Sequence, residues 1–492
     1  MHDSKEIAMS KEPRAADSAT EEPNNSLPTP KYTDGGYGWV IMASCFVITG
    51  LSTSFVKTFG IFFLDIKAYF DALAFKVSWI SAIIVAVFHL GSPIASALSL
   101  LLSHRVIIII GGILSMLGVL LGSFGFSLLW MYLTTGFLVG LGNGFAWVPS
   151  VSLVTQYFTE RRPLANALAS CGECVFTFIF TPFFQWLVIQ MSWQQAMTII
   201  AGIQLNLCVC GALMRPYRPQ KKSLNSTSPS ATTSGKDLCS TSPEHKKKPA
   251  HFIDLPLLKQ PKFICMVFFG FFSVMGFLVP AIYLIPHAQN IGILDFQAAL
   301  LMSYWSAADL IGRIGCGWLA NLRLMKSIRL AIIMITILSI ALMLFPIAKN
   351  YTLLVIFSCI CGFFFGTILA LLVTMLTDVM GIEKLDNALG LIMFFRSFGC
   401  LIGPTLAGLL VDLTRDYSNG FYIAGGGMFI AACFLILADY FVSCEQNSSQ
   451  GTKKEVEAFI SQHQPWEEAE KEKLGTDRTN GSELELKNKV YE

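Results

Sequence analysis

The stretch TDGGYGWVIMASCF, Thr33–Phe46, marks the point where a polar N-terminal segment gives way to a long apolar run. An acid at the head of a helix is stabilised by the positive end of the helix dipole and by free backbone N–H groups. Tyrosine and tryptophan are typical of the membrane–water interface. The stretch therefore predicts the start of a membrane-spanning helix, in which Asp34, Gly35, Gly36 and Trp39 shape the helix start and its gating.

The composition excludes an ordinary soluble protein. Of the 492 residues, 53% are hydrophobic and 14% are charged, whereas a soluble domain carries about 25% charged residues. A helix that spans a bilayer needs roughly 20 apolar residues. Twelve runs satisfy this, in two groups of six: approximately 38–64, 78–102, 106–126, 128–155, 164–190 and 194–214, then 262–285, 297–320, 327–347, 351–379, 386–411 and 418–443.

A segment rich in Ser, Thr, Pro and Lys separates the two groups, and this composition predicts disorder. We therefore divide the chain into a disordered tail (1–33), a six-helix bundle (34–214), a linker (215–261), a second bundle (262–443) and a disordered tail (444–492). Lys and Arg are enriched on the cytoplasmic side of membrane proteins. That rule places both tails and the linker in the cytoplasm, together with the basic residues Arg105, Arg161, Arg162, Arg323, Lys326, Arg329 and Lys384.

The two groups of runs share short motifs in the same order. The pattern L-x-N-A-L occurs at Leu164 and again at Leu385, near the start of the fifth and eleventh runs. Glycines four residues apart lie shortly upstream of each copy, Gly136 and Gly140 in the fourth run and Gly362 and Gly366 in the tenth. Matching order at a nearly constant offset predicts two parallel six-helix repeats.

Three stretches carry a specific resemblance: DGGYGW at 34–39, YFTERRPLANALASCG at 157–172 and NLCVCGALMRP at 206–216. In these the chain resembles the monocarboxylate transporter family of the major facilitator superfamily. The resemblance implies an all-α membrane protein with twelve transmembrane helices in two six-helix parallel repeats, located in the plasma membrane. It also implies a single-span immunoglobulin-like ancillary protein as a partner, which the sequence itself neither shows nor excludes.

The second stretch departs from the family pattern at Glu160, Ala167 and Cys171. Its two arginines, Arg161 and Arg162, remain. Because arginines at helix ends normally set orientation, we interpret both as gate or anchor residues at the inner surface.

Ionisable residues inside the spans are the main site candidates, because a charge in the membrane is costly and usually functional. Lys57 ends the first run, and Asp309 and Arg313 share one face of the eighth because they are four residues apart. Two structural alternatives are a lysine that reaches the interface and a self-neutralising pair. The resemblance implies a site role instead, in which Lys57 and Arg313 bind a carboxylate and Asp309 carries a proton.

Four further residues complete the candidates. Glu173 lies about 14 Å into the fifth helix, and the resemblance places that helix beside the eighth, so we expect Glu173 to pair with Arg313 and to take part in proton coupling. Arg396 replaces an acid found in several proton-linked relatives. We expect it to bind cargo if it faces the cavity, or to contact the second helix otherwise. Asn143 is a candidate cavity residue, and His89 is more typical of a structural histidine.

These features predict a secondary transporter that moves small monocarboxylates (lactate, pyruvate or ketone-body-like acids) by alternating access, coupled to a proton. An alternative is a proton-independent carrier of a larger or amphoteric metabolite. An enzyme would need a nucleophile–base pair, an acidic dyad or a metal cluster, and no such pattern occurs. We therefore expect no catalytic residues, metal or cofactor. A sensor that binds a carboxylate without moving it is a third possibility.

Overall fold

The computed structural model describes residues 36–158, 161–215, 255–321, 325–381 and 385–445, and in these ranges every regular element is a helix. Asp34, Gly35, most of the predicted linker and nearly all of both predicted tails lie outside the described residues. The division of the chain into bundles, linker and tails therefore stays a prediction.

The first half is built from helices that match the first six apolar runs, with the first, fourth and sixth each divided. They are α1 (Gly38–Lys57) and α2 (Gly60–Tyr69), α3 (Ala74–Leu101), α4 (His104–Gly122), α5 (Leu128–Met131) with the π-helical η1 (Tyr132–Leu138) and α6 (Val139–Tyr157), α7 (Arg162–Gln190), and α8 (Trp193–Gln204) with α9 (Asn206–Leu213).

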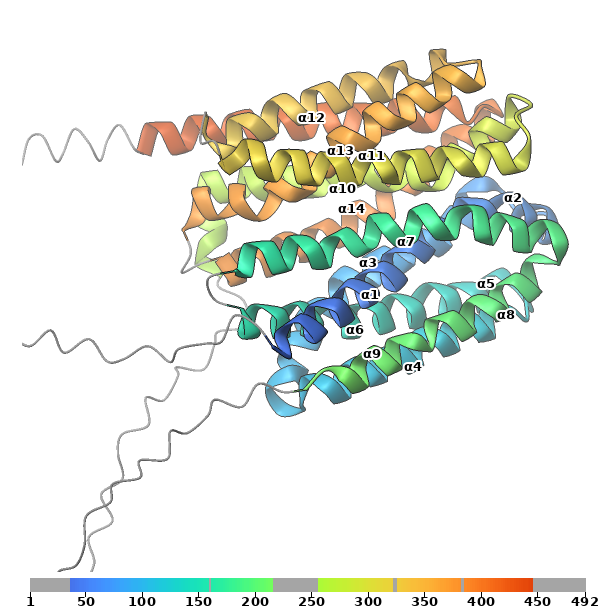
Figure 1. Cartoon of the computed structure of the whole chain (residues 1–492). Helices are drawn as coiled ribbons and strands as arrows, with labels where there is room; N and C mark the ends of the chain where they lie inside the picture. The colour runs from blue at the N-terminus through green and yellow to red at the C-terminus, as the bar shows by residue number, and fades with distance from the viewer. Residues whose placement is uncertain (1–35, 159–160, 216–254, 322–324, 382–384, 446–492) are drawn as a thin grey trace, which may run out of the picture.

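The second half begins with the short 3-10 helix η2 (Leu255–Lys259) and continues with long helices. They are α10 (Pro261–Asn290), α11 (Asp295–Asn321), α12 (Ser327–Leu344) with the 3-10 turn η3 (Phe345–Ile347), α13 (Tyr351–Met380), α14 (Leu385–Thr414) and a last helix, Ser418–Glu445. In Figure 1, α10–α13 lie above α1 and α3–α9.

Eleven helices of the described chain are long and apolar enough to cross a membrane. The eighth predicted span is α11, which is 27 residues long but less apolar, because it contains Asp309 and Arg313. It packs along α7, α10 and α13. The sequence therefore predicted the position of α11 correctly. This helix is more polar than the other eleven predicted spans.

Glycines at matching places bring the second and fourth spans of each half into close contact. A Cβ atom on Gly140 of α6 would lie 2.5 Å from the carbonyl oxygen of Ile84 in α3, and a Cβ atom on Gly366 of α13 would collide with the carbonyl oxygen of Asp309 in α11. Only glycine lets two helix backbones approach so closely. The glycines that the sequence predicts to be equivalent serve the same helix crossing, and the predicted repeat is confirmed.

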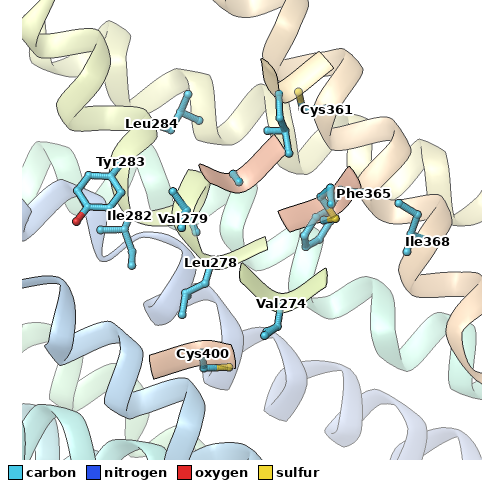
Figure 2. Close-up of a cluster of buried hydrophobic side chains, with 14 of the residues drawn as sticks. Val274, Leu278, Val279, Ile282, Tyr283, Leu284, Cys361, Phe365, Ile368 and Cys400 are labelled. Atoms are coloured by element: carbon cyan, nitrogen blue, oxygen red, sulfur yellow. The ribbon is translucent and has the colours of Figure 1, made fainter. Parts of the chain in front are cut away.

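The core of the second half lies where α10 meets α13 and α14. Figure 2 shows Val274, Leu278 and Val279 of α10 in one cluster with Phe365 of α13 and Cys400 of α14, all of them nearly or fully buried. This apolar packing fixes the three helices whose polar residues are described below.

The two halves are held together at the end of the molecule that carries α2, opposite the first residues of α1 and the last residues of the helix Ser418–Glu445 (Figure 1). Near the end of α14, the carboxylate of Asp412 accepts hydrogen bonds from the backbone N–H groups of Ala74 (2.7 Å) and Phe75 (3.0 Å). These residues begin α3, and a helix start offers free N–H groups and a positive dipole end. Asp412 is therefore an anion bound to a helix N-terminus of the other half.

We predict that Asp412→Asn weakens this contact, because the amide keeps one acceptor oxygen but loses the charge that the helix start attracts. The loss is about 1 kcal/mol, or roughly a fivefold shift in the opening equilibrium. The reporter is Ser78→Cys, a buried position that faces Pro404 across the same contact. Its labelling rate with a membrane-impermeant maleimide should rise by that factor in Asp412→Asn. Asp416→Asn is the control, because the Asp416 carboxylate accepts a hydrogen bond from the backbone N–H of Ser418 in its own loop and takes no part in the contact with α3. Equal rates in both variants would contradict the prediction.

Candidate functional site

Four charged side chains from three helices form a closed cluster at the boundary between the halves. The Lys57 amine at the end of α1 lies 2.8 Å from Glu173 Oε1 of α7 and 3.0 Å from Asp309 Oδ2 of α11. The Arg313 guanidinium, also on α11, donates from Nη2 to Glu173 Oε2 (2.8 Å) and from Nε to Asp309 Oδ1 (2.7 Å). Each cation contacts both anions, so the four groups alternate in charge around a ring.

The local helix geometry explains how Lys57 reaches the ring. It is the last residue of α1, and a turn at Thr58 and Phe59 separates α1 from α2. The carbonyl oxygen of Ser54 accepts hydrogen bonds from both the backbone N–H (2.9 Å) and the Oγ1 hydroxyl (2.8 Å) of Thr58 at this helix end. The Lys57 amine also lies over the ring of Phe365, 4.9 Å from its centroid, and this adds a cation–π attraction.

Close helix contacts place the two acids. A Cβ atom on Gly172 of α7 would collide with the carbonyl oxygen of Phe46 in α1, and Glu173 is the next residue. Gly366 plays the same part for Asp309, against which it packs. Both glycines lie beside an acid of the ring. The residues that allow the close helix contacts therefore also determine where Glu173 and Asp309 are placed.

The ring is buried and its charges cancel. The side chains of Lys57, Glu173, Asp309 and Arg313 are 10%, 14%, 0% and 9% exposed. A buried ion pair offsets its desolvation only when the geometry is good and the remaining donors are satisfied. Arg313 meets this condition, because its Nη1 donates to the carbonyl oxygen of Ser170 (3.3 Å) while its other nitrogens engage both acids.

Several predictions about the ring can now be compared with its geometry. The expected pairing of Glu173 with Arg313 is confirmed, and so is the shared face of Asp309 and Arg313. The alternative in which Lys57 reaches the membrane interface is wrong, because its amine is buried between two acids. Sequence reasoning missed the contacts of Lys57 with these acids. The available signal was that Lys57, Glu173, Asp309 and Arg313 all lay inside predicted spans, where a buried charge needs a partner of opposite sign.

Two other candidates lie away from the ring contacts. The Asn143 amide of α6 donates to the carbonyl oxygen of Ser52 in α1 (3.0 Å) and accepts from Ser115 Oγ of α4 (2.9 Å), so both of its ends are engaged between helices of the first half. Arg161 is exposed just before α7, and the side chain of Arg162 lies outside the described residues. The cargo role of Asn143 and the anchor role of the arginines remain predictions.

The start of α1 is a packed helix end. Gly36 has a positive φ of 60°, which only glycine adopts readily. Tyr37 donates from its hydroxyl to the carbonyl oxygen of Leu213 at the end of α9 (2.6 Å), and Trp39 packs edge-on against Phe158 at 5.3 Å between ring centroids. These contacts fit the predicted role of this stretch in shaping the helix start.

Arg396 belongs to a second polar centre, at the contact between α14, α10 and α3. It is 5% exposed, its Nη1 donates to Ser273 Oγ at 3.5 Å, and its guanidinium lies over the ring of Phe277, 5.7 Å from the centroid. His89 of α3 is close enough to interact with it electrostatically and has Cys400 Sγ 3.7 Å from its Nδ1. Arg396 thus lies where α14 packs against α3 and α10, and which of its two expected roles it has stays a prediction.

No group of three or more metal-ligating side chains occurs in the part of the chain that the structure describes, and the cysteines there are free. The ring itself consists of two cations and two carboxylates.

The chain was compared with known proteins. Residues 42–404 and 326–475 match the Major Facilitator Superfamily. Monocarboxylate transporter 7 of Homo sapiens is 33% identical over 451 residues, covering 82% of this chain and 86% of that protein. Monocarboxylate transporter 12 of Xenopus laevis is 36% identical over 430 residues, covering 85% and 92%.

The structure is also similar to an inward-facing, unoccupied bacterial homolog of the human lysosomal transporter Spinster. The TM-score is 0.58 at 14% identity, over 83% of this chain and 97% of that one, and this likeness supports the fold alone. The sequence relationships go further. The chain belongs to the major facilitator superfamily and, within it, to the monocarboxylate transporter family, so it is a membrane transporter and not an enzyme.

Proposed function

We propose that this protein moves small monocarboxylates across the plasma membrane by alternating access, together with a proton. The observation that carries the proposal is the neutral ring of Lys57, Glu173, Asp309 and Arg313, which joins the two halves of the fold. The monocarboxylate transporters that are its relatives supply the substrate class.

The charge of the ring provides the reason for proton coupling. With both acids ionised, Arg313 and Lys57 are fully paired and have no attraction to spare for a substrate. Protonation of Glu173 or Asp309 leaves the ring with one net positive charge and frees donors of Arg313. A carboxylate then binds the freed guanidinium through two parallel hydrogen bonds and restores neutrality. Proton and carboxylate thus enter as a neutral pair, which limits the cost of crossing a medium of low dielectric constant.

The same ring explains how binding is linked to a conformational change. Lys57 and Glu173 belong to the first half, while Asp309 and Arg313 belong to the second. Two of the four ion pairs of the ring, Lys57–Asp309 and Glu173–Arg313, therefore cross between the halves. Rearranging these pairs around a substrate changes the attraction between the halves, as alternating access around a central site requires. In this account Asn143 and the arginines at the start of α7 support the scaffold and its gating.

The experiment is uptake of labelled lactate and butyrate into cells that express the protein, at acidic and at neutral external pH. We predict faster uptake at acidic pH. We also predict that Arg313→Lys lowers uptake about tenfold or more while surface delivery stays normal, because lysine keeps the charge but loses the planar pair of donors. One charge-assisted hydrogen bond is worth about 1.5–3 kcal/mol, which corresponds to about tenfold or more.

Arg329→Lys is the matched control, because Arg329 forms an exposed ion pair with Asp439 outside the ring and its replacement should leave uptake unchanged. Uptake that is independent of external pH would contradict proton coupling. Unchanged kinetics in Arg313→Lys would remove Arg313 from the substrate site.

The orientation of the chain gives a further prediction. The Lys and Arg bias of the connections places both termini in the cytoplasm. An epitope tag at either terminus should therefore be stained by antibody only in permeabilised cells, with an antibody against a co-expressed surface protein as the control for intact cells. Staining of a terminal tag in intact cells would overturn the assigned orientation.

A further inference from the structure

Arg396 differs from the other buried cations of this fold in having no counter-charge. Its side chain is 5% exposed, its Nε has no hydrogen-bond partner in the described part of the chain, and its contact with Ser273 Oγ is long at 3.5 Å. No carboxylate of the described ranges forms an ion pair with it, whereas Arg313 is paired with two. The groups that interact with it electrostatically, His89 and Cys400, supply no carboxylate.

A buried arginine that has no anion is unfavourable in a membrane protein, and such residues commonly mark a ligand pathway. The guanidinium is nevertheless well prepared for a ligand. Its stem lies against Gly270 of α10, where a Cβ atom would approach Arg396 Cγ to 3.3 Å. The Ser273 hydroxyl beside it is a further polar group, one helical turn along from Gly270. The planar guanidinium of Arg396 therefore presents N–H donors along two edges and has a polar neighbour in Ser273, but no acid of the described residues is bound to it.

Two aromatic rings connect Arg396 to the charged ring. Arg396 lies over Phe277, Phe277 lies 4.5 Å from Phe365 between centroids in an edge-on arrangement, and Phe365 carries the Lys57 amine over its face. The two cations thus lie at opposite ends of a pair of phenyl rings. A ligand that reached both would have an acidic group at each end and an apolar middle against the rings.

The repeat relates the two helices that carry Glu173 and Arg396, although the two residues are not at the same position on them. Glu173 and Arg396 follow the two copies of L-x-N-A-L by nine and eleven residues, on the equivalent helices α7 and α14. In the first copy the acid neutralises Arg313. In the second the cation faces α3 with nothing to neutralise it. One polar centre is therefore complete without a ligand, while the other lacks an anion.

We propose that Arg396 is a binding site for a second acidic group of the cargo, so that the protein accepts dicarboxylates with an apolar spacer in preference to simple monocarboxylates. The first carboxylate binds at the charged ring, and to that extent the inference rests on the proposed function. The second carboxylate accepts hydrogen bonds from the guanidinium of Arg396, and the spacer lies along Phe277 and Phe365. This second contact needs no proton, because Arg396 has no acid to displace.

The test compares two diacids, succinate and adipate, with their monomethyl esters, which keep the carbon chain but lose one charge. Ligand binding is measured as the rise in melting temperature of the purified full-length protein in detergent. In wild type we expect at least one diacid to stabilise the protein at about tenfold lower concentration than its ester. In Arg396→Gln this difference should disappear, because diacid and ester then have only the charged ring to bind. Arg329→Gln, which removes an exposed and paired cation, should keep the difference.

The melting temperature without ligand separates a binding role from a structural one. A buried cation that has no partner destabilises the fold, so Arg396→Gln should melt at the same temperature as wild type or higher. A lower melting temperature, or failure to fold, would mean that Arg396 is a structural partner and would overturn the proposal. Three other results would also overturn the proposal. In wild type, diacid and ester could bind equally in both pairs, or none of the four compounds could bind. The difference between diacid and ester could also persist in Arg396→Gln.

The binding measurement does not depend on whether the protein transports the compound. Diacid binding through Arg396 without uptake in cells would uphold this site and reject the proposed transport. Proton-coupled uptake of monocarboxylates by a protein that does not distinguish diacids from esters would do the reverse.

Discussion

A charge that is buried between membrane helices has to be neutralised where it lies, because no solvent is available to do it. Placing one lysine or arginine at the centre of a helix in the membrane costs about 2.5–3.5 kcal/mol. In this protein Lys57 and Arg313 meet that constraint by sharing Glu173 and Asp309. The helices that carry these residues must therefore stay adjacent, and the glycine contacts of Gly172 and Gly366 make the required approach possible. The ion pairs therefore require close helix packing, and the close packing places the charges where they can pair.

The same constraint separates the two polar centres of the fold. The ring is neutral without cargo, and in the function we propose it needs a proton before it can bind an anion. The centre at Arg396 is cationic without cargo, so it attracts an anion directly. Both centres occupy equivalent places in the two repeats, at the contacts of α7 with α11 and of α14 with α3. In our proposals, the charged ring therefore responds to protons and the centre at Arg396 responds to the charge of the ligand alone.

Much of this arrangement could be predicted from the sequence, because it depends on properties that a single helix reveals. Hydropathy gave the spans, the repeated L-x-N-A-L and glycine pairs gave the two halves, and the spacing of Asp309 and Arg313 gave their shared face. The contacts of Lys57 could not be predicted in this way. They depend on the rotation of α1 about its axis and on the turn at Thr58 and Phe59, which packing against other helices decides.

The isolation of Arg396 could not be predicted for the same reason. The sequence places it in the eleventh span but does not show which helices face it. Its neighbours Ser273, Phe277 and His89 come from two other spans. Whether a buried cation has a partner is a property of the assembled fold. Among the described residues, Arg313 is paired with two acids and Arg396 with none.

The central claim is that the ring binds a carboxylate only after one of its acids is protonated, and Glu173→Gln tests it most directly. Glutamine keeps the size of the side chain but removes one negative charge, so the ring carries a net positive charge at every pH. The account predicts tighter carboxylate binding at neutral pH and a smaller ratio of uptake at acidic to neutral external pH. An unchanged ratio, or weaker binding at neutral pH, would contradict it.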